Sequence, residues 1–100
     1  IIVAAVEPSD NPKVIVKEEY AAVNAAVQNM LIAAHALGLG AIWRTGEPCY
    51  DPEMRQLFNL SEKGEVLGFI YMGYPNMTPP VKKVKEVNEV TKWLKSEADY

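Results

Sequence analysis

Two apolar runs mark segments that the sequence pattern predicts as strands. Residues 1–6 are continuously apolar with β-branched residues at their start, which is typical of a strand buried on both faces in a parallel sheet. Residues 65–74 have the strongest strand pattern in the sequence. Gly68 lies inside this second run, and a glycine within a strand indicates close approach of another backbone or of a bound group. We therefore expect two strands, with a neighbour packed closely against Gly68.

A long helix is predicted between these runs, over about residues 17–37. Apolar side chains recur on one stripe at helical spacing, while the remaining faces are mostly alanine. A helix that is apolar almost all round is buried on more than one side. A chain of 100 residues has too little mass to cover such a helix, so we expect a second subunit to do so. The stripe consists of Val23, Val27, Met30, Leu31 and Ala34.

A glycine-rich turn is expected to connect this helix to a short third strand. Gly38 supplies the left-handed conformation that commonly ends a helix, and residues 41–43 fit a short buried strand. An arginine, a threonine and a glycine then follow at the carboxyl end of that strand. In open α/β sheets, ligands bind at this end of the strands. Residues 43–46, called the corner below, are therefore the predicted ligand site.

Residues 45–50 are predicted to form a loop, and a short helix is predicted to follow it. Asp51 provides the N-cap of this helix and Pro52 its first residue, because proline needs no hydrogen-bond partner there. We expect the helix to end near Asn59. The side chains predicted to face inward are Met54, Leu57 and Phe58.

Two further segments are predicted to lie outside the core. Residues 7–12 hold two prolines with aspartate and asparagine, which is typical of an exposed loop. Residues 81–100 place valines among lysines and glutamates, a pattern that fits either a helix or an edge strand. We expect this segment to be a carboxyl-terminal arm that lies on another surface. The domain division is thus one domain over residues 1–100 that includes the arm.

Composition and charge argue against several classes of function. One hundred residues make one small domain at most, and 49% apolar residues suffice for a packed core. The net charge of -3 argues against a nucleic-acid partner, which needs a basic face. No apolar run approaches the length of about 20 residues that a membrane span needs. Cys49 is the only cysteine, so we expect no disulfide and a reducing, cytoplasmic setting.

The chain begins without methionine, directly in the pattern of a buried strand. Proteins seldom begin with a core strand. We therefore expect a fragment, namely the carboxyl-terminal part of a longer domain.

Three features that could suggest other chemistry have simpler explanations. His35 is the only histidine and has no accompanying ligand residues, so we expect a hydrogen-bonded structural residue and no metal site. Cys49 has no second cysteine and no neighbouring histidine, which favours a loop or packing role. Gly38 and Gly40 close a helix, whereas the glycines of a dinucleotide-binding fingerprint open one, and the third glycine is absent.

Three segments in this order resemble the carboxyl-terminal part of nitroreductase-family flavoproteins. The first is the alanine-rich helix over residues 28–40, which leads into Ile42-Trp43-Arg44-Thr45-Gly46. The second is the short helix over residues 51–60, and the third is the strand over residues 66–75 with its Gly-Tyr-Pro turn. Because the order and spacing of all three agree, the chain is similar to the short, minimal members of that family.

The resemblance implies an α+β fold with a mainly antiparallel central sheet, the long helix packed on it, and an intertwined homodimer. It implies FMN at the dimer interface, with NAD(P)H reducing the flavin in a ping-pong reaction that then reduces nitroaromatics, quinones or similar acceptors. An antiparallel sheet conflicts with the parallel sheet indicated by residues 1–6, and we follow the family on this point. The family's arginine-rich amino-terminal segment, which grips the FMN phosphate, has no match in this chain.

The resemblance assigns flavin contacts to Trp43, Arg44, Thr45 and Gly46. The chemistry agrees, because a guanidinium suits both an anionic phosphate and a flavin ring edge that becomes negative on reduction. The alternative is that Trp43 is a core residue and that Arg44 pairs with a nearby carboxylate such as Glu47. Some relatives contact nicotinamide through the segment that here comprises Ala33, Ala34, His35, Ala36, Leu37 and Gly38.

Two functions from different classes follow. The first is an FMN-dependent NAD(P)H oxidoreductase, for which no catalytic side chain is expected because the flavin carries the hydride chemistry. The second is a non-catalytic α/β module for dimerisation or ligand binding that has lost the flavin.

Overall fold

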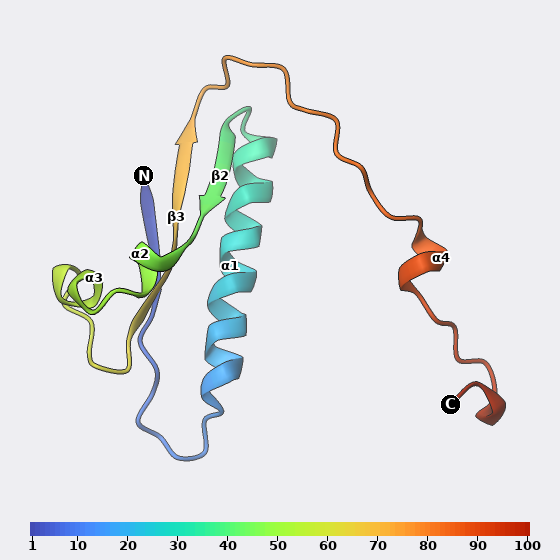
Figure 1. The fold of residues 1–100 in the computed structure, drawn as a ribbon, viewed down its shortest axis with the longest axis horizontal. Coiled ribbons are helices and arrows are strands. Elements are labelled where there is room, and N and C mark those ends of the chain that lie inside the picture. Colours follow the sequence, from blue (N-terminus) through green and yellow to red (C-terminus); the bar gives the residue numbers. More distant parts are fainter.

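The computed structural model describes residues 1–100, with a three-stranded antiparallel sheet at its centre (Figure 1). β3 (Glu65–Gly73) lies between β1 (Ile2–Val6) and β2 (Gly40–Arg44), so the strand order is β1-β3-β2. The antiparallel pairing implied by the resemblance is confirmed, and the parallel sheet indicated by the first apolar run is wrong. An apolar run carries no information on strand direction. The predicted burial on both faces is also wrong for the single chain, because β1 is an edge strand in which Ala4 and Val6 are buried and Ile2 is exposed.

β3 contains a β-bulge at Leu67. The partner of Ala4 is Gly68, yet the next residue of β1 pairs with Val66, so Leu67 has no partner in β1. On its other side, β3 pairs with β2, which ends at Arg44 opposite the residue after Gly68. The bulge therefore lies just beyond the end of β2, beside the corner.

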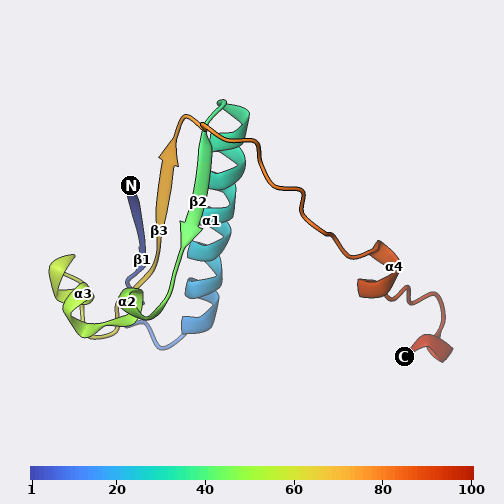
Figure 2. The same ribbon diagram turned by 45° about the horizontal axis from the view of Figure 1, so that its top comes forward.

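α1 (Val16–Ala36) packs along one face of this sheet, as Figures 1 and 2 show. The predicted helix is confirmed, and its ends differ from the prediction by one residue each. The predicted stripe is also confirmed, because all five of its residues are buried or half-buried. The centre of the core is formed by Ala4, Val27 and Ile70, with Val23, Met30, Leu31, Trp43 and Met72 packed around them.

The opposite face of α1 is exposed in the single chain. Ile32 is 59% exposed, and six alanines of the helix are also exposed. The sheet thus covers one side of the helix, and burial of a further side by a second subunit remains a prediction. The exposed alanines are Ala21, Ala22, Ala25, Ala26, Ala33 and Ala36.

Gly38 ends α1 as predicted. It adopts a left-handed conformation with φ of 78°. The Gly38 N–H donates to the carbonyl of His35 (3.1 Å), and the Leu39 N–H donates to the carbonyl of Ala34 (2.9 Å). This pair of hydrogen bonds is a Schellman motif, which satisfies carbonyl groups that the helix leaves free and turns the chain into β2.

A helical turn, α2 (Glu47–Tyr50), follows the corner where we predicted only a loop. Pro48 suggested a loop, but proline is compatible with the first turn of a helix because its missing N–H would be unpaired there. α2 packs against β3 and buries the Cys49 side chain. The predicted packing role of Cys49 is therefore confirmed, although its predicted loop location is wrong.

α3 (Pro52–Leu57) begins as predicted. The Asp51 side chain accepts a hydrogen bond of 2.9 Å from the Glu53 N–H and so caps the helix. Of the three residues predicted to face inward, only Met54 is half-buried, whereas Leu57 is 68% exposed and Phe58 is also exposed. The prediction of a fully inward apolar face is therefore wrong, because the single chain places no element over Leu57.

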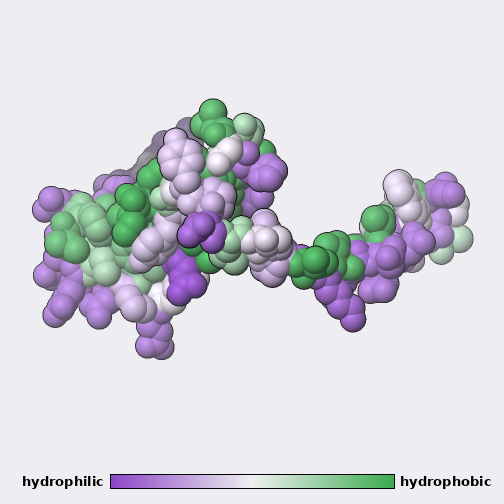
Figure 3. All heavy atoms as spheres, turned by 90° about the horizontal axis from the view of Figure 1, so that it is seen from above, coloured by the Kyte–Doolittle hydropathy of each residue, from purple (hydrophilic) through white to green (hydrophobic).

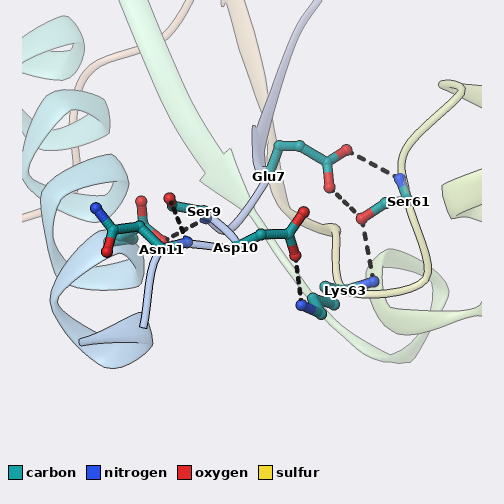
Figure 4. Close-up of polar contacts among 7 residues, drawn as sticks. Glu7, Ser9, Asp10, Asn11, Ser61 and Lys63 are labelled. Carbon is teal, nitrogen blue, oxygen red and sulfur yellow. Dashed lines mark hydrogen bonds and ion pairs between the residues drawn. The ribbon is translucent and has the colours of Figure 1, made fainter. Parts of the chain in front are cut away.

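Polar contacts tie the loop after β1 to the turn before β3 (Figure 4). The Glu7 carboxylate accepts hydrogen bonds from the Ser61 N–H (2.9 Å) and from the Ser61 hydroxyl. Lys63 Nζ lies 2.5 Å from Asp10 Oδ1. The Ser61 hydrogen bonds lower the pKa of Glu7, and Lys63 lowers the pKa of Asp10. These contacts join residues more than 50 positions apart in the sequence.

The segment after β3 leaves the body of the fold and projects into solvent (Figures 1 and 3). It contains only two short helical segments, α4 (Val87–Val90) and the 3-10 turn η1 (Glu97–Asp99), and neither contacts another element. The radius of gyration is consequently 18.0 Å, against about 13 Å for a compact domain of this length. In the single chain this segment lies on no other element, so a carboxyl-terminal arm that lies on another surface stays a prediction. No helix of the chain combines the length and apolarity that a membrane crossing requires.

Candidate functional site

The corner lies where β2 ends and the chain turns into α2. Its four residues do not act as one surface, because alternate residues of a strand point to opposite faces of the sheet. Trp43 lies on the α1 side with the core, while Arg44 points to the other face. Thr45 and Gly46 follow outside the strand and are exposed. The corner therefore divides into an anchor, Trp43, and an accessible part formed by residues 44–46.

The Trp43 side chain is held by the protein itself. Its indole N–H donates a 3.0 Å hydrogen bond to the carbonyl of Leu67, and the ring packs partly against the core. It also lies directly over Gly68, where a Cβ atom would overlap the indole Nε1 and Cδ1 atoms. A close neighbour at Gly68 is thus confirmed, but its nearest atoms belong to this indole, where another backbone or a bound group was predicted. The alternative that Trp43 is a core residue is confirmed for its side chain.

Arg44 has an exposed guanidinium without a protein partner. The chain contains one salt bridge, between Lys63 and Asp10, and no hydrogen bond involves the Arg44 side chain. The alternative pairing of Arg44 with Glu47 is therefore absent. A cation held at the end of a strand and left unpaired is free to meet an anionic group of a ligand.

Thr45 and Gly46 add hydrogen-bonding capacity beside this cation. Neither of their backbone N–H groups takes part in a turn or cap hydrogen bond, and the Thr45 hydroxyl is also free. Gly46 has φ of 127°, which favours glycine, and a Cβ there would meet only Pro48 Cδ at 3.7 Å. The backbone is thus open to close approach by a ligand. This set of one guanidinium, one hydroxyl and two N–H donors fits an anionic or carbonyl-bearing group.

The surface next to the corner has the opposite charge. A shallow hollow of about 650 Å³ lies there, lined by Glu47, Pro48, Tyr50 and Asp51. Its two carboxylates disfavour an anion inside the hollow itself. An anionic group would therefore be placed on the Arg44 side of the corner.

The corner does not lie at the ligand-binding edge of a parallel sheet, although this was predicted. The rule that ligands bind at the carboxyl ends of strands applies to parallel α/β sheets, because only there do those ends share one edge. In this antiparallel sheet, the neighbour of β2 runs in the opposite direction. The case for the corner rests instead on the free Arg44 guanidinium and its neighbouring donors.

The second predicted segment, residues 33–38, lies at the opposite end of β2 from the corner. α1 ends there and β2 begins two residues later, at Gly40. The corner begins at Trp43, three residues along β2 from Gly40, which corresponds to about 10 Å at a rise of about 3.4 Å per residue. Within one chain, the structure therefore does not bring the two predicted segments together. His35 in this segment is exposed, and no group of three His, Cys, Asp or Glu residues could hold a metal ion.

Sequence reasoning missed an apolar groove at this same end of the sheet. The groove has a volume of about 600 Å³, and Lys82 carries its only charge. It could not be found from sequence periodicity, because it joins the start of β2 to the turn after β3. It is lined by Gly40, Ala41, Ile42, Tyr71, Met72, Gly73, Tyr74, Pro75, Asn76, Met77, Pro79, Pro80 and Lys82.

Comparison with known proteins gives consistent matches. A sequence model of the nitroreductase family matches residues 1–74. The "Putative NAD(P)H nitroreductase YfhC" of Bacillus subtilis (strain 168) is 35% identical over 66 residues, which are 66% of this chain and 34% of that protein. The "Putative NAD(P)H nitroreductase YdjA" of Escherichia coli (strain K12) is 35% identical over 77 residues, which are 77% of this chain and 42% of that protein.

A solved structure matches the fold as well. The crystal structure of a nitroreductase-like family protein from Bacillus cereus aligns with a TM-score of 0.80 and 26% sequence identity. The alignment covers 94% of this chain and 50% of that one. The chain thus spans half or less of the length of these matched proteins.

Proposed function

Because this chain belongs to the nitroreductase family, to which residues 1–74 match, we propose that the protein is an NAD(P)H-dependent oxidoreductase that binds FMN at the corner. The observation that carries the proposal is the exposed guanidinium of Arg44, which has no protein partner and stands beside the free donors of Thr45 and Gly46. When bound, FMN supplies the hydride chemistry, and the protein supplies its position and electrostatic environment.

Each residue of the corner has a separate role in this proposal. Arg44 binds an anionic part of the flavin, either its phosphate or the ring edge that becomes negative on reduction. Thr45 and Gly46 donate hydrogen bonds from the hydroxyl and the backbone. Trp43 holds the end of β2 in place and makes its main contacts within the core.

Residues 33–38 are the proposed contact for the nicotinamide ring of NAD(P)H. The carboxyl end of α1 carries the negative end of the helix dipole, which disfavours phosphate groups and suits a neutral or cationic ring. The groove nearby is largely apolar, which fits the same part of the co-substrate. Because this segment and the corner lie at opposite ends of β2 within one chain, we propose that they serve different copies of the flavin site in a homodimer.

The proposed homodimer uses the exposed alanine-rich face of α1. Small side chains allow two backbones to approach closely, and this face is uncovered in the single chain. A flavin at the boundary between two subunits could then receive contacts from both. The electron acceptor is proposed to be a nitroaromatic, a quinone or a similar small molecule.

The test is a visible absorption spectrum of the purified natural protein, followed by addition of NAD(P)H. We expect flavin absorption that NAD(P)H bleaches. A colourless protein that does not take up added FMN would contradict the proposal and leave the non-catalytic module as the explanation.

The same measurement tests the assignment of Arg44. Arg44→Ala is expected to weaken FMN binding by about 1–3 kcal/mol, the scale of a lost hydrogen bond to a charged group. Arg55→Ala is the matched control, because Arg55 also carries a guanidinium but donates it to the carbonyl of Glu62 (2.6 Å). Equal FMN affinity of Arg44→Ala and the natural protein would show that Arg44 takes no part in binding.

A further inference from the structure

The end of β2 is fixed by contacts between Trp43 and the β-bulge in β3. The Trp43 indole N–H donates a 3.0 Å hydrogen bond to the Leu67 carbonyl, across 24 positions of sequence. Leu67 is the residue that the bulge leaves without a partner in β1. The Trp43 side chain on β2 therefore donates to a carbonyl at the bulge of β3.

Gly68 provides the space for this arrangement. A Cβ atom at Gly68 would overlap the Nε1 and Cδ1 atoms of Trp43, so any other residue would displace the indole. The same Cβ atom would lie 3.1 Å from the Arg44 carbonyl oxygen, which is tighter than an ordinary contact. Gly68 also has φ of 157°, at the edge of the region that favours glycine. A side chain at this position therefore disturbs both of the last two residues of β2.

These contacts determine the direction in which Arg44 points. Because side chains alternate along a strand, fixing the Trp43 ring on the α1 side fixes Arg44 on the opposite face. β2 ends at Arg44, so no further strand pair holds the residues that follow. The indole and the bulge are thus the last constraints before the chain enters residues 45–46.

We propose that Gly68 and the Trp43 indole are positioning residues for the corner, which hold Arg44, Thr45 and Gly46 in the conformation that binds flavin. This inference rests on the proposed function, because it concerns the same site. It adds that the affinity of the corner for FMN depends on Gly68 and on the Trp43 indole, although the contacts at both positions lie within the protein.

The test compares Gly68→Ala with Gly64→Ala in the natural protein. Both are glycine-to-alanine changes at crowded positions, but a Cβ at Gly64 meets Leu60 and the Glu7 carboxylate and no residue of the corner. We expect Gly68→Ala to weaken FMN binding at least tenfold and Gly64→Ala, which disturbs packing elsewhere, to change it less than twofold. The dissociation constant of FMN is measured by quenching of flavin fluorescence, at a temperature well below the unfolding midpoint of each variant.

Trp43→Phe provides a second test in case Gly68→Ala fails to fold. Phenylalanine keeps an aromatic ring in the core but removes the N–H that donates to Leu67. We expect a severalfold loss of FMN affinity. Unchanged affinity in Trp43→Phe, or in a folded Gly68→Ala with a lowered unfolding temperature, would overturn the inference and assign both residues a purely structural role.

The outcomes separate this inference from the proposed function. If the natural protein binds FMN and Arg44→Ala weakens that binding while both positioning variants bind normally, the inference fails and the proposed function stands. If the natural protein binds no FMN at all, the proposed function fails and this inference fails with it.

Discussion

Gly38 and Gly64 are both required by the fold, but for different physical reasons. Gly38 has φ of 78°, and the space where its Cβ would stand is empty within 4 Å. Gly64 is buried, and its Cβ would lie 2.8 Å from Leu60 Cβ and 3.1 Å from the Glu7 carboxylate oxygens. The first position therefore demands glycine through backbone conformation, and the second through lack of space.

Gly38→Ala is expected to lower the free energy of unfolding by about 1–2 kcal/mol, the cost of a left-handed conformation for an L-residue. Gly38→Asn is the matched control, because asparagine tolerates this conformation better and the space is open. Both values follow from denaturant unfolding. A cost of Gly38→Asn equal to that of Gly38→Ala would show that something other than backbone conformation sets the requirement.

At the scale of elements, α1 has one covered face and one bare face. Ala25 and Ile32 lie seven residues apart, two helical turns, and so share the bare face. Both are exposed in the single chain, although neither is polar. A bare apolar face on the longest helix is the structural reason for proposing a second subunit.

Ala25→Glu is expected to leave the stability of one chain within about 0.5 kcal/mol, because the position is exposed. The same charge buried between two helices would disfavour a dimer, so we expect the dimer to dissociate into monomers in sedimentation experiments. Gln56→Glu on exposed α3 adds the same charge elsewhere and serves as the control. A dimer that tolerates Ala25→Glu would place the subunit contact away from this face.

The elements could be predicted from sequence much more fully than their pairing. The stripe of α1, the cap at Asp51 and the long β3 are local patterns, and each was found within a few residues of its observed bounds. Strand direction was indicated wrongly, because burial alone does not encode it. α2 was missed because Pro48 is as compatible with a first helical turn as with a loop.

At the candidate site, too, patterns that are local in the sequence could be predicted, and contacts between distant segments could not. The corner was predicted from an arginine and a threonine after a short strand, which are adjacent in sequence, and its role as a ligand site stays a prediction. The partner of Gly68 could not be identified, because the Trp43 indole reaches it across 25 positions of sequence. The apolar groove was missed for the same reason, since its walls come from two distant segments.

At the scale of the whole molecule, the contacts of Glu7 and Asp10 join the start of the chain to the turn before β3. Both carboxyl pKa values are lower in the folded protein than their ordinary values of 4.5 and 3.8. A lowered pKa contributes stability above the unfolded pKa, and this contribution is lost as the pH falls through the folded pKa. The contacts of Glu7 and Asp10 therefore stabilise the folded protein at neutral pH and stabilise it less in acid.

Glu7→Gln is expected to lower the unfolding temperature at pH 7, because an amide replaces one of the two acceptor oxygens by a donor and its remaining oxygen accepts less strongly than a carboxylate does. The difference from the natural protein should shrink as the pH falls from the ordinary pKa of 4.5 through the lower pKa of Glu7 in the folded protein, where the carboxylate itself becomes protonated. Thermal unfolding at a series of pH values measures this. Glu62→Gln is the control, because the Glu62 side chain makes no hydrogen bond and only the Glu62 backbone carbonyl accepts one. A difference that stays constant with pH would show that the charge of Glu7 is irrelevant.

The projecting arm has an evolutionary consequence. Since α4 and η1 contact no other element, no residue in them is needed to complete the hydrophobic core. The match to the family ends at residue 74, one residue after β3, which is where the chain leaves the body. Mutations in α4 and η1 are therefore invisible to selection for folding of this body, and they can accumulate unless an outside surface constrains them.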